Sequence, residues 1–306
     1  NIMTTAQIIS IIIFVVVMVL IASEKIHRTT AALCGAVALI LFGIIDFDTS
    51  VSHIDFGTLG VLVGMMLFVG VIKESGIFEY LAIKSAKMVK GNPWMIMIVF
   101  VLITALLSAL LDNVTTILLI GPVTYTVCKL LLGINPVPFF ITEILASNIG
   151  GTATLIGDPP NIMIGSAANL SFIDFVNYDT PAVLLMLISV IVVCYFLYGR
   201  KLSVAPEKRE AVLDLVEENA IHDKKLFRKS VVMIFLVALA FVVHGQFGIE
   251  PCVIALTAAA VMLVISGADM EQTIREVEWS TIGFFAGLFV VVGGMAETGV
   301  INMLAQ

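Results

Sequence analysis

The sequence predicts an all-α membrane protein in which an inverted repeat carries a re-entrant hairpin and a broken helix, the second copy of the repeat being incomplete. Three observations lead to this class. The chain is 60% hydrophobic and only 13% charged, with a mean hydropathy of +1.11, whereas soluble domains are about 25% charged. A polar stretch rich in glycine and proline interrupts an apolar run at 138–172. The chain also resembles itself when it is shifted by 223 residues.

Apolar runs that suit spanning helices recur along the chain. About 20 apolar residues cross the hydrocarbon core as a helix. No Lys or Arg precedes the first run, so it is predicted to be a retained span rather than a signal peptide. Loops rich in Lys and Arg alternate with acidic loops, which predicts an N-terminus outside and basic loops in the cytoplasm. The predicted spans are 8–22, 30–45, 56–72, 181–198, 231–245, 251–265 and 281–295.

This pattern predicts a multi-pass integral protein of the cell membrane, with the lipid bilayer as its surroundings. The formal net charge is -7 and no strongly basic patch is present, so nucleic acid is excluded as a partner. Four widely spaced cysteines have neither the density of a disulfide scaffold nor the C-x-x-C spacing of a metal site.

The segment 92–133 is too long to cross the membrane once. As a single helix it would measure about 60 Å, twice the hydrocarbon core of about 30 Å. It must therefore fold back, and polar residues at 111–116 mark the turn. Two full crossings and a re-entrant hairpin both fit the charge pattern, and the ion-binding groups at the turn favour the re-entrant hairpin. These groups are Asp112, Asn113, Thr115 and Thr116.

The apolar run 138–172 contains a stretch, Ser147–Asn161, that should not face lipid. Unwound polar backbone at membrane depth is tolerated only where protein or a watery cavity surrounds it, and broken helices are the best sequence indication of a transporter binding site. Glycines in this stretch permit backbone conformations that free carbonyls. Asp158 before Pro159 is predicted to cap a second half-helix. The half-helices are expected at about 138–147 and 159–170, against the alternative of a proline kink or an ordinary loop.

The two polar elements together form the predicted ion or substrate site. A carboxylate at membrane depth is costly, so Asp112 and Asp158 are functional by default, as proton carriers or cation ligands. The alternatives are a turn residue for Asp112 and a simple N-cap for Asp158. No catalytic residue and no cofactor is expected beyond H⁺ or Na⁺ as a coupling ion. From the broken helix the site takes Ser147, Asn148, Gly150, Gly151, Thr152, Thr154, Gly157, Asp158 and Asn161. The possible Na⁺ ligands are Asp112, Asn113, Gly151, Thr152 and Asp158.

The internal similarity sets the predicted domains. The shift by 223 residues aligns 54–60 with 277–283 without a gap, and it also pairs Gly64 with Gly287 and Gly76 with Gly299. An odd number of crossings lies between the copies, so the second copy is inverted in the membrane. The first repeat is then 1–199 and the start of the second is 230–306. The linker 200–229 is expected to lie as a helix, 206–219, on the cytoplasmic membrane surface.

The same shift makes an expectation about a longer chain. A second hairpin should fall near residue 335 and a second broken helix near 375, in a chain of about 420 residues. The second repeat is therefore expected to be truncated here.

The motifs at 111–116, 122–124 and 148–161 resemble the ion transporter superfamily, and within it the branch of arsenite permeases, NhaD-type antiporters and the melanosomal P protein. The resemblance covers 8–306. It implies a hairpin that enters from the cytoplasm and faces the broken helix. It also implies a homodimer held by scaffold helices and an elevator-like movement of the transport part. Aspartate at both motifs departs from the dicarboxylate carriers of the superfamily.

The function predicted from these features is secondary active transport rather than enzymatic activity. The main hypothesis is a proton- or sodium-coupled transporter of a small inorganic anion or oxyanion such as arsenite. The alternative is a Na⁺/H⁺ antiporter in which the two aspartates bind both cations in turn. An intramembrane aspartyl protease is a remote alternative, because such enzymes carry a Gly-x-Gly-Asp motif and this chain has Leu155-Ile156-Gly157-Asp158 instead.

Overall fold

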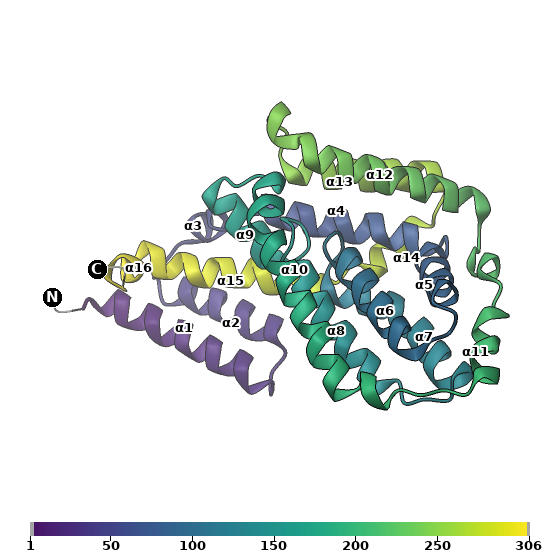
Figure 1. Ribbon diagram of the computed structural model, residues 1–306. Coiled ribbons are helices and arrows are strands. Elements are labelled where there is room, and N and C mark those ends of the chain that lie inside the picture. The colour runs from purple at the N-terminus through teal and green to yellow at the C-terminus, as the bar shows by residue number, and fades with distance from the viewer. Residues whose placement is uncertain (1–2, 305–306) are drawn as a thin grey trace. The chain divides into compact units, whose positions relative to one another are not determined.

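The computed structural model describes residues 3–304, which form helices joined by turns, with no strand among them (Figure 1). Six of these helices are long and apolar enough to cross a membrane within the described residues. The predicted all-α membrane class is confirmed. The α-helices are α1 Thr5–Ser23, α2 Arg28–Leu41, α3 Phe47–Ser52, α4 Phe56–Lys73, α5 Ile77–Met88, α6 Pro93–Ser108, α7 Asn113–Tyr125, α8 Val137–Gly151, α9 Pro159–Ala168, α10 Phe172–Leu197, α11 Pro206–Leu213, α12 Lys224–Phe247, α13 Pro251–Ser266, α14 Met270–Glu276, α15 Trp279–Glu297 and α16 Val300–Leu304.

The helices pack as two compact units. One contains the residues up to Val63 together with those from Val277 onward, and the other contains Gly64–Glu276. In the first unit α15 lies along α2, and both contact α1. Small residues allow this close packing, because a Cβ on Gly35 would lie 2.4 Å from a methyl group of Val17.

The order of helices occurs twice along the chain. Shifted by 223 residues, α1 to α5 fall on α12 to α16, and Gly76 and Gly299 share a left-handed φ of 77° and 75°. In the second unit a Cβ on Gly64 would lie 2.6 Å from the Ala255 carbonyl carbon. In the first unit a Cβ on Gly287 would lie 2.8 Å from the carbonyl carbon of Ala32, which is the repeat equivalent of Ala255. The repeat in the sequence therefore also occurs in the helix order and in one close helix contact.

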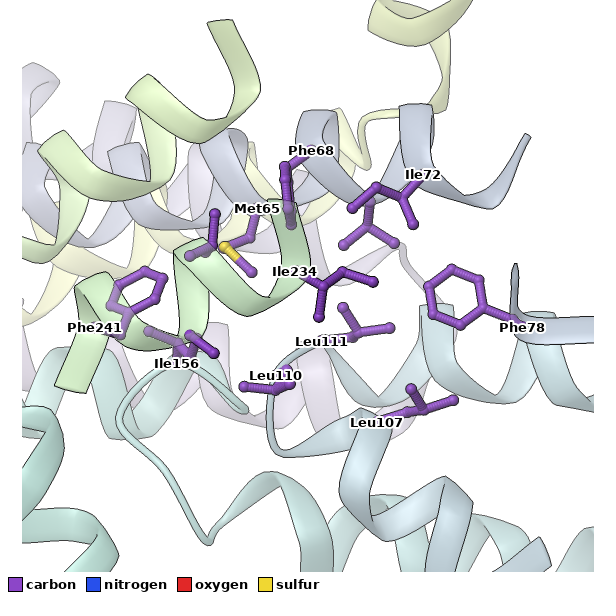
Figure 2. Close-up of a pocket in the computed structure, with 13 residues that line it drawn as sticks. Met65, Phe68, Ile72, Phe78, Leu107, Leu110, Leu111, Ile156, Ile234 and Phe241 are labelled. Carbon is purple, nitrogen blue, oxygen red and sulfur yellow. The ribbon is translucent and has the colours of Figure 1, made fainter. Parts of the chain in front are cut away.

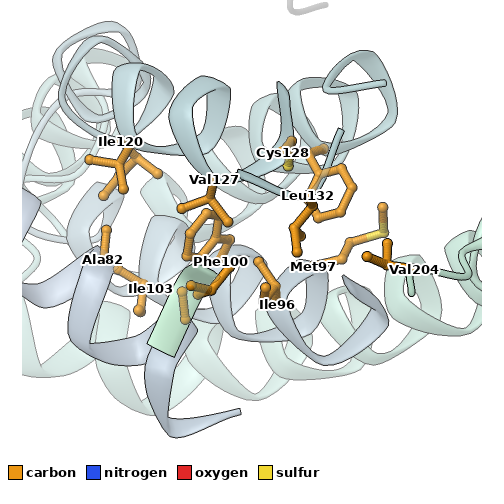
Figure 3. Packing of buried hydrophobic residues seen from close by; sticks show 14 of the residues in the cluster. Ala82, Ile96, Met97, Phe100, Ile103, Ile120, Val127, Cys128, Leu132 and Val204 are labelled. Atoms are coloured by element: carbon orange, nitrogen blue, oxygen red, sulfur yellow. The ribbon is translucent and has the colours of Figure 1, made fainter. Parts of the chain in front are cut away.

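The second unit holds the hairpin and the broken helix. Within it α8 packs along both arms of the hairpin, α6 and α7. A buried apolar cluster joins the two arms to α5 and to the start of α8 (Figure 3). Its largest fully buried side chains include Phe100 on α6 and Phe139 on α8. Arm α7 contains Pro122, which cannot donate a backbone hydrogen bond, and continues as a π-helical turn at Thr126–Leu131.

The linker differs from the prediction. Its helix α11 ends at Leu213, short of the expected residue 219. Val212 is fully buried in the cluster around the hairpin rather than facing a membrane surface. Lys87 of α5 donates to the Leu215 carbonyl and pairs with Glu217 at 2.5 Å. The apolar face that the sequence assigned to lipid therefore packs partly against protein.

Candidate functional site

The tip of the hairpin is a short turn between α6 and α7. Ser108 ends α6, and Asp112 is the N-cap of α7. Its Oδ1 accepts a hydrogen bond from the Thr115 backbone N–H at 2.9 Å, which satisfies one of the unpaired donors that open every helix. Asp112 therefore has a structural role in addition to its charge.

The break lies between α8 and α9, at residues 152–158. Helix α8 continues to Gly151, four residues beyond the predicted end, and α9 begins at Pro159 as predicted. Buried unpaired carbonyls are costly, so the break needs hydrogen-bond donors. The Asn161 amide donates to the Gly151 and Thr154 carbonyls at 3.2 and 2.8 Å. Thr180 donates to the Ala153 carbonyl at 3.0 Å. One buried asparagine and one threonine thus hold the unwound backbone.

The glycines of the break serve close approach rather than unusual torsions. None of Gly150, Gly151 and Gly157 has a positive φ, which corrects the sequence interpretation. A Cβ on Gly150 would lie 2.3 Å from the Ala105 carbonyl oxygen, and one on Gly157 would lie 2.7 Å from the Ser108 carbonyl oxygen. Because no side chain fits there, the backbone of the break lies directly against the hairpin tip.

Polar contacts also join the tip to the break. The Ser108 hydroxyl lies 2.6 Å from Asn113 Oδ1 and 2.7 Å from the Ser147 carbonyl. Thr154 donates to the Ala109 carbonyl, and Asn113 Nδ2 lies 3.4 Å from Asn148 Oδ1. The Ser108 hydroxyl has one hydrogen, which the Asn113 side-chain oxygen and the Ser147 carbonyl oxygen share, so this contact is a three-centre hydrogen bond. The tip and the break form one polar assembly.

Asp158 stands at the N-cap position of α9 without capping it. Its backbone is extended, but its side chain makes no cap hydrogen bond. The N2 residue is Pro160, which has no N–H, and the N–H of Asn161 bonds to the Asp158 carbonyl oxygen instead. The half-buried carboxylate interacts with the Asn113 amide, and the charge of Asp112 acts on it. The expected N-cap role is therefore wrong for the side chain.

The remaining predicted site residues mostly form hydrogen bonds within their own helix. Thr152 donates back to the Ile149 carbonyl at 2.8 Å, and Asn148 donates to the Ile144 carbonyl at 2.8 Å. Thr116 is fully buried, and its hydroxyl has no partner among the described residues. Thr115 contributes its backbone N–H to the Asp112 cap.

Oxygen atoms that could bind a cation are present in Asp112, Asn113 and Asp158. The described residues contain no group of three His, Cys, Asp or Glu that would suit a transition metal. Carboxylate and amide oxygens are hard ligands and suit a cation such as Na⁺. An uncapped, half-buried carboxylate beside a second carboxylate is a fitting position for it.

The tip and the break also contribute apolar side chains to a pocket. Leu110 and Leu111 of the tip and Ile156 of the break line one pocket with Met65 of α4 and Phe241 of α12 (Figure 2). The assembly thus combines polar groups with apolar side chains that face helices of the same unit.

The site predicted from the sequence left out two polar residues of this region, Glu143 and Thr124. Glu143 lies on α8, two turns before Gly151, and is fully buried. Thr124 of α7 donates to its Oε1 at 2.6 Å. An acidic residue inside an apolar half-helix was the available signal, because such residues are functional by default.

Comparison with known proteins gives the family. The citrate transporter family, CitMHS, matches residues 18–306. The chain belongs to this family. The family is consistent with the predicted ion transporter superfamily, which is confirmed.

Similar proteins come from bacteria and from humans. An uncharacterized transporter of Mycobacterium tuberculosis is 46% identical over 304 residues, which are 98% of this chain and 70% of that protein. The human P protein is 30% identical over 365 residues, covering 94% of this chain and 43% of that protein. The magnetosome protein MamN of Magnetospirillum gryphiswaldense is 32% identical over 282 residues, covering 89% and 63%. The chain is a multi-pass transporter of the cell membrane.

Proposed function

We propose that this transporter is secondary active and couples the movement of a small inorganic anion or oxyanion, such as arsenite, to H⁺ or Na⁺. One observation carries the proposal. Asp158 occupies the N-cap position of α9, but its half-buried side chain does not cap the helix. The carboxylate interacts instead with the Asn113 amide and with the charge of Asp112. A carboxylate that caps no helix is available to bind a cation.

The coupling follows from charge. Two ionised carboxylates close together in a poorly hydrated place repel each other, and a bound cation or proton relieves this repulsion. The tip 108–116 and the stretch 147–161 contain no Lys, Arg or His. An anion would therefore approach two negative groups unless a cation bound first. Binding in that order makes transport of the anion depend on the cation.

The same lack of basic residues supports a second candidate, a Na⁺/H⁺ antiporter. In this mechanism Asp112 and Asp158 bind Na⁺ and H⁺ in turn, and no anion is needed. Citrate, which the family description names, carries more negative charge than arsenite and would need more bound cation at this site.

Transport by the full chain in proteoliposomes tests these candidates. Uptake of arsenite and of citrate is measured under a Na⁺ gradient or a pH gradient alone, and Na⁺-driven proton release is measured with a trapped pH indicator. A cation-coupled anion transporter gives gradient-driven uptake that is lost in Asp158→Asn. Proton release on Na⁺ addition without anion identifies the antiporter. No response to either gradient contradicts both.

The resemblance to the superfamily further suggests a homodimer with elevator-like movement, which we include in the proposal. Native mass spectrometry in detergent measures the dimer. The transporter family gives no support to the aspartyl protease.

A further inference from the structure

Glu143 is a buried acid that the proposed coupling at Asp158 does not use. It has no exposed surface, and its Oε2 has no hydrogen-bond partner among the described residues. The Thr124 hydroxyl is the one partner of Oε1, at 2.6 Å. An ionised carboxylate cannot be held in a dry interior by one hydroxyl without a cation. The geometry therefore favours a neutral acid.

The surroundings of Glu143 hold no charge that would stabilise a carboxylate. Helices α6 and α8 contain no other charged residue. On the second arm of the hairpin, the Cys128 thiol is the titratable group that interacts electrostatically with Glu143. Lys129 next to it is exposed. On α5, Lys84 contacts Tyr80, Lys87 pairs with Glu217, and Glu79 lines a groove beside the linker. On α10, Asp174 and Asp179 lie near the start of the helix.

The helix registers connect Glu143 to the aspartate site. Ser108 of α6 contacts Ser147 of α8. Thr104 lies one helical turn before Ser108 on α6, and Glu143 lies one turn before Ser147 on α8. Thr104 and Glu143 are therefore 39 residues apart in the sequence, as the two contacting serines are. The Thr104 hydroxyl is also buried and has no partner in the described part of the chain.

The second arm of the hairpin continues this arrangement. Asn113, Thr116 and Thr124 follow one another at helical spacing on α7, and the first and last of them contact α8 at Asn148 and Glu143. Thr116 between them has an unpartnered hydroxyl. Three unpartnered buried oxygens thus lie on three helices, α6, α7 and α8, that pack on one another. Buried oxygens without a partner are rare in native proteins and require an explanation.

We propose that Glu143 is a proton-binding site of the transport core, loaded in the conformation described here and emptied in another state of the cycle. On release the carboxyl O–H bond breaks and the proton passes to water. The carboxylate that remains keeps the hydrogen bond from Thr124. A metal cation suits the position less well, because hard divalent cations take six or more oxygen ligands and a proton needs one. This inference rests on the proposed coupled transport for its role in the cycle, although not for the binding itself.

Infrared difference spectroscopy of the full chain in lipid tests the binding without any transport. We expect the carbonyl stretch of a protonated carboxylic acid at neutral pH, its loss in Glu143→Gln, and its retention in the exposed control Glu210→Gln. In Thr124→Val the band should stay and move to higher frequency, because the hydrogen bond to the carboxyl group is gone. A band that is unchanged in both Glu143→Gln and Thr124→Val would overturn the proposal.

Transport measurements then test the role in the cycle. Glutamine imitates the neutral acid and cannot release a proton, so Glu143→Gln should flatten the dependence of labelled arsenite or Na⁺ exchange on pH and reduce the accumulation driven by a pH gradient. An unchanged pH profile would refute the role of Glu143. Absence of exchange in the wild type would refute the proposed function and leave the infrared result standing.

Discussion

The two aspartates of the site occupy the same place in two helix starts and behave differently. Asp112 caps α7 through the N–H of Thr115, whereas Asp158 precedes α9 and caps nothing. The difference lies at N3, where the Thr115 N–H bonds to the Asp112 carboxylate and the Asn161 N–H bonds to the Asp158 backbone carbonyl. At N2, Pro160 has no N–H to offer in its place. The backbone bond at N3 and the proline at N2 thus separate a helix-capping carboxylate from one that caps no helix.

This difference assigns the parts of the proposed mechanism. The start of α7 is fixed by the Asp112 cap, and the charge of Asp112 acts on the Asp158 carboxylate through space. The start of α9 is held by other groups, chiefly Asn161, so the Asp158 side chain can change its partner without unfolding the helix. Substitutions that exchange or remove these two behaviours test the comparison.

The largest effect is expected for Asp158→Asn. Loss of a charge-assisted contact to the coupling cation should cost about 3 kcal/mol, which is roughly 100-fold in affinity. The melting temperature should stay close to that of the wild type, because no cap is lost. Asp112→Asn, which still caps α7, is the matched variant and should lose less affinity. Cation-dependent uptake and thermal unfolding measure both, and equal losses would remove the distinction between the two aspartates.

A methyl group at Gly157 tests the close approach on which the comparison depends. The added Cβ would lie 2.7 Å from the Ser108 carbonyl oxygen of the tip and 2.5 Å from the Gly151 carbonyl oxygen, so Gly157→Ala should destabilise the protein by about 1–3 kcal/mol and weaken cation binding. Gly245→Ala is the control, since its Cβ would meet Ser171 at an ordinary 3.5 Å. Denaturation in detergent gives the two stabilities. If the two variants are equally stable, the tip and the break do not pack this tightly.

Pro160→Ala should give the Asp158 carboxylate a cap bond that it lacks. The new N–H at N2 offers the carboxylate a cap bond of about 1 kcal/mol, which predicts a roughly fivefold weaker cation affinity. Helix α9 should become slightly more stable. Titration of Na⁺-dependent or pH-dependent uptake measures the change. A tighter cation affinity would contradict the view that proline keeps this carboxylate free.

The smallest effect concerns Glu217 in the linker, a carboxylate whose partner is a permanent cation. The hydrogen bond from Lys87 holds the pKa of Glu217 below its usual value of 4.5. A carboxyl with a lowered pKa stabilises the folded state above its unfolded pKa and loses this contribution as the pH falls through the folded pKa. Linker docking should thus be intact at pH 7 and weaken below about 4.5. Proteolysis of the linker against pH measures it, with Glu217→Gln expected to show no such pH dependence.

Much of the architecture could be read from the chain. Composition and span lengths predicted the membrane class, and the excess length of 92–133 predicted that the chain folds back. The pair Pro159 and Pro160 fixed the start of α9, because proline is suited to the first turn of a helix. The end of α8 was placed too early, since Gly150 and Gly151 were interpreted as breaking residues and are packing residues.

Local sequence determined where polar groups interrupt apolar helices, because hydropathy, proline and glycine act over a few neighbouring residues. Only the tertiary structure decided that Asn161 and Thr180 hold the unwound backbone and that the Asp158 carboxylate meets the Asn113 amide. It also brought Thr124 to Glu143 across 19 residues of chain. Those outcomes depend on hydrogen-bond partners supplied by other helices, and helix packing sets these partners rather than the order of residues along one helix.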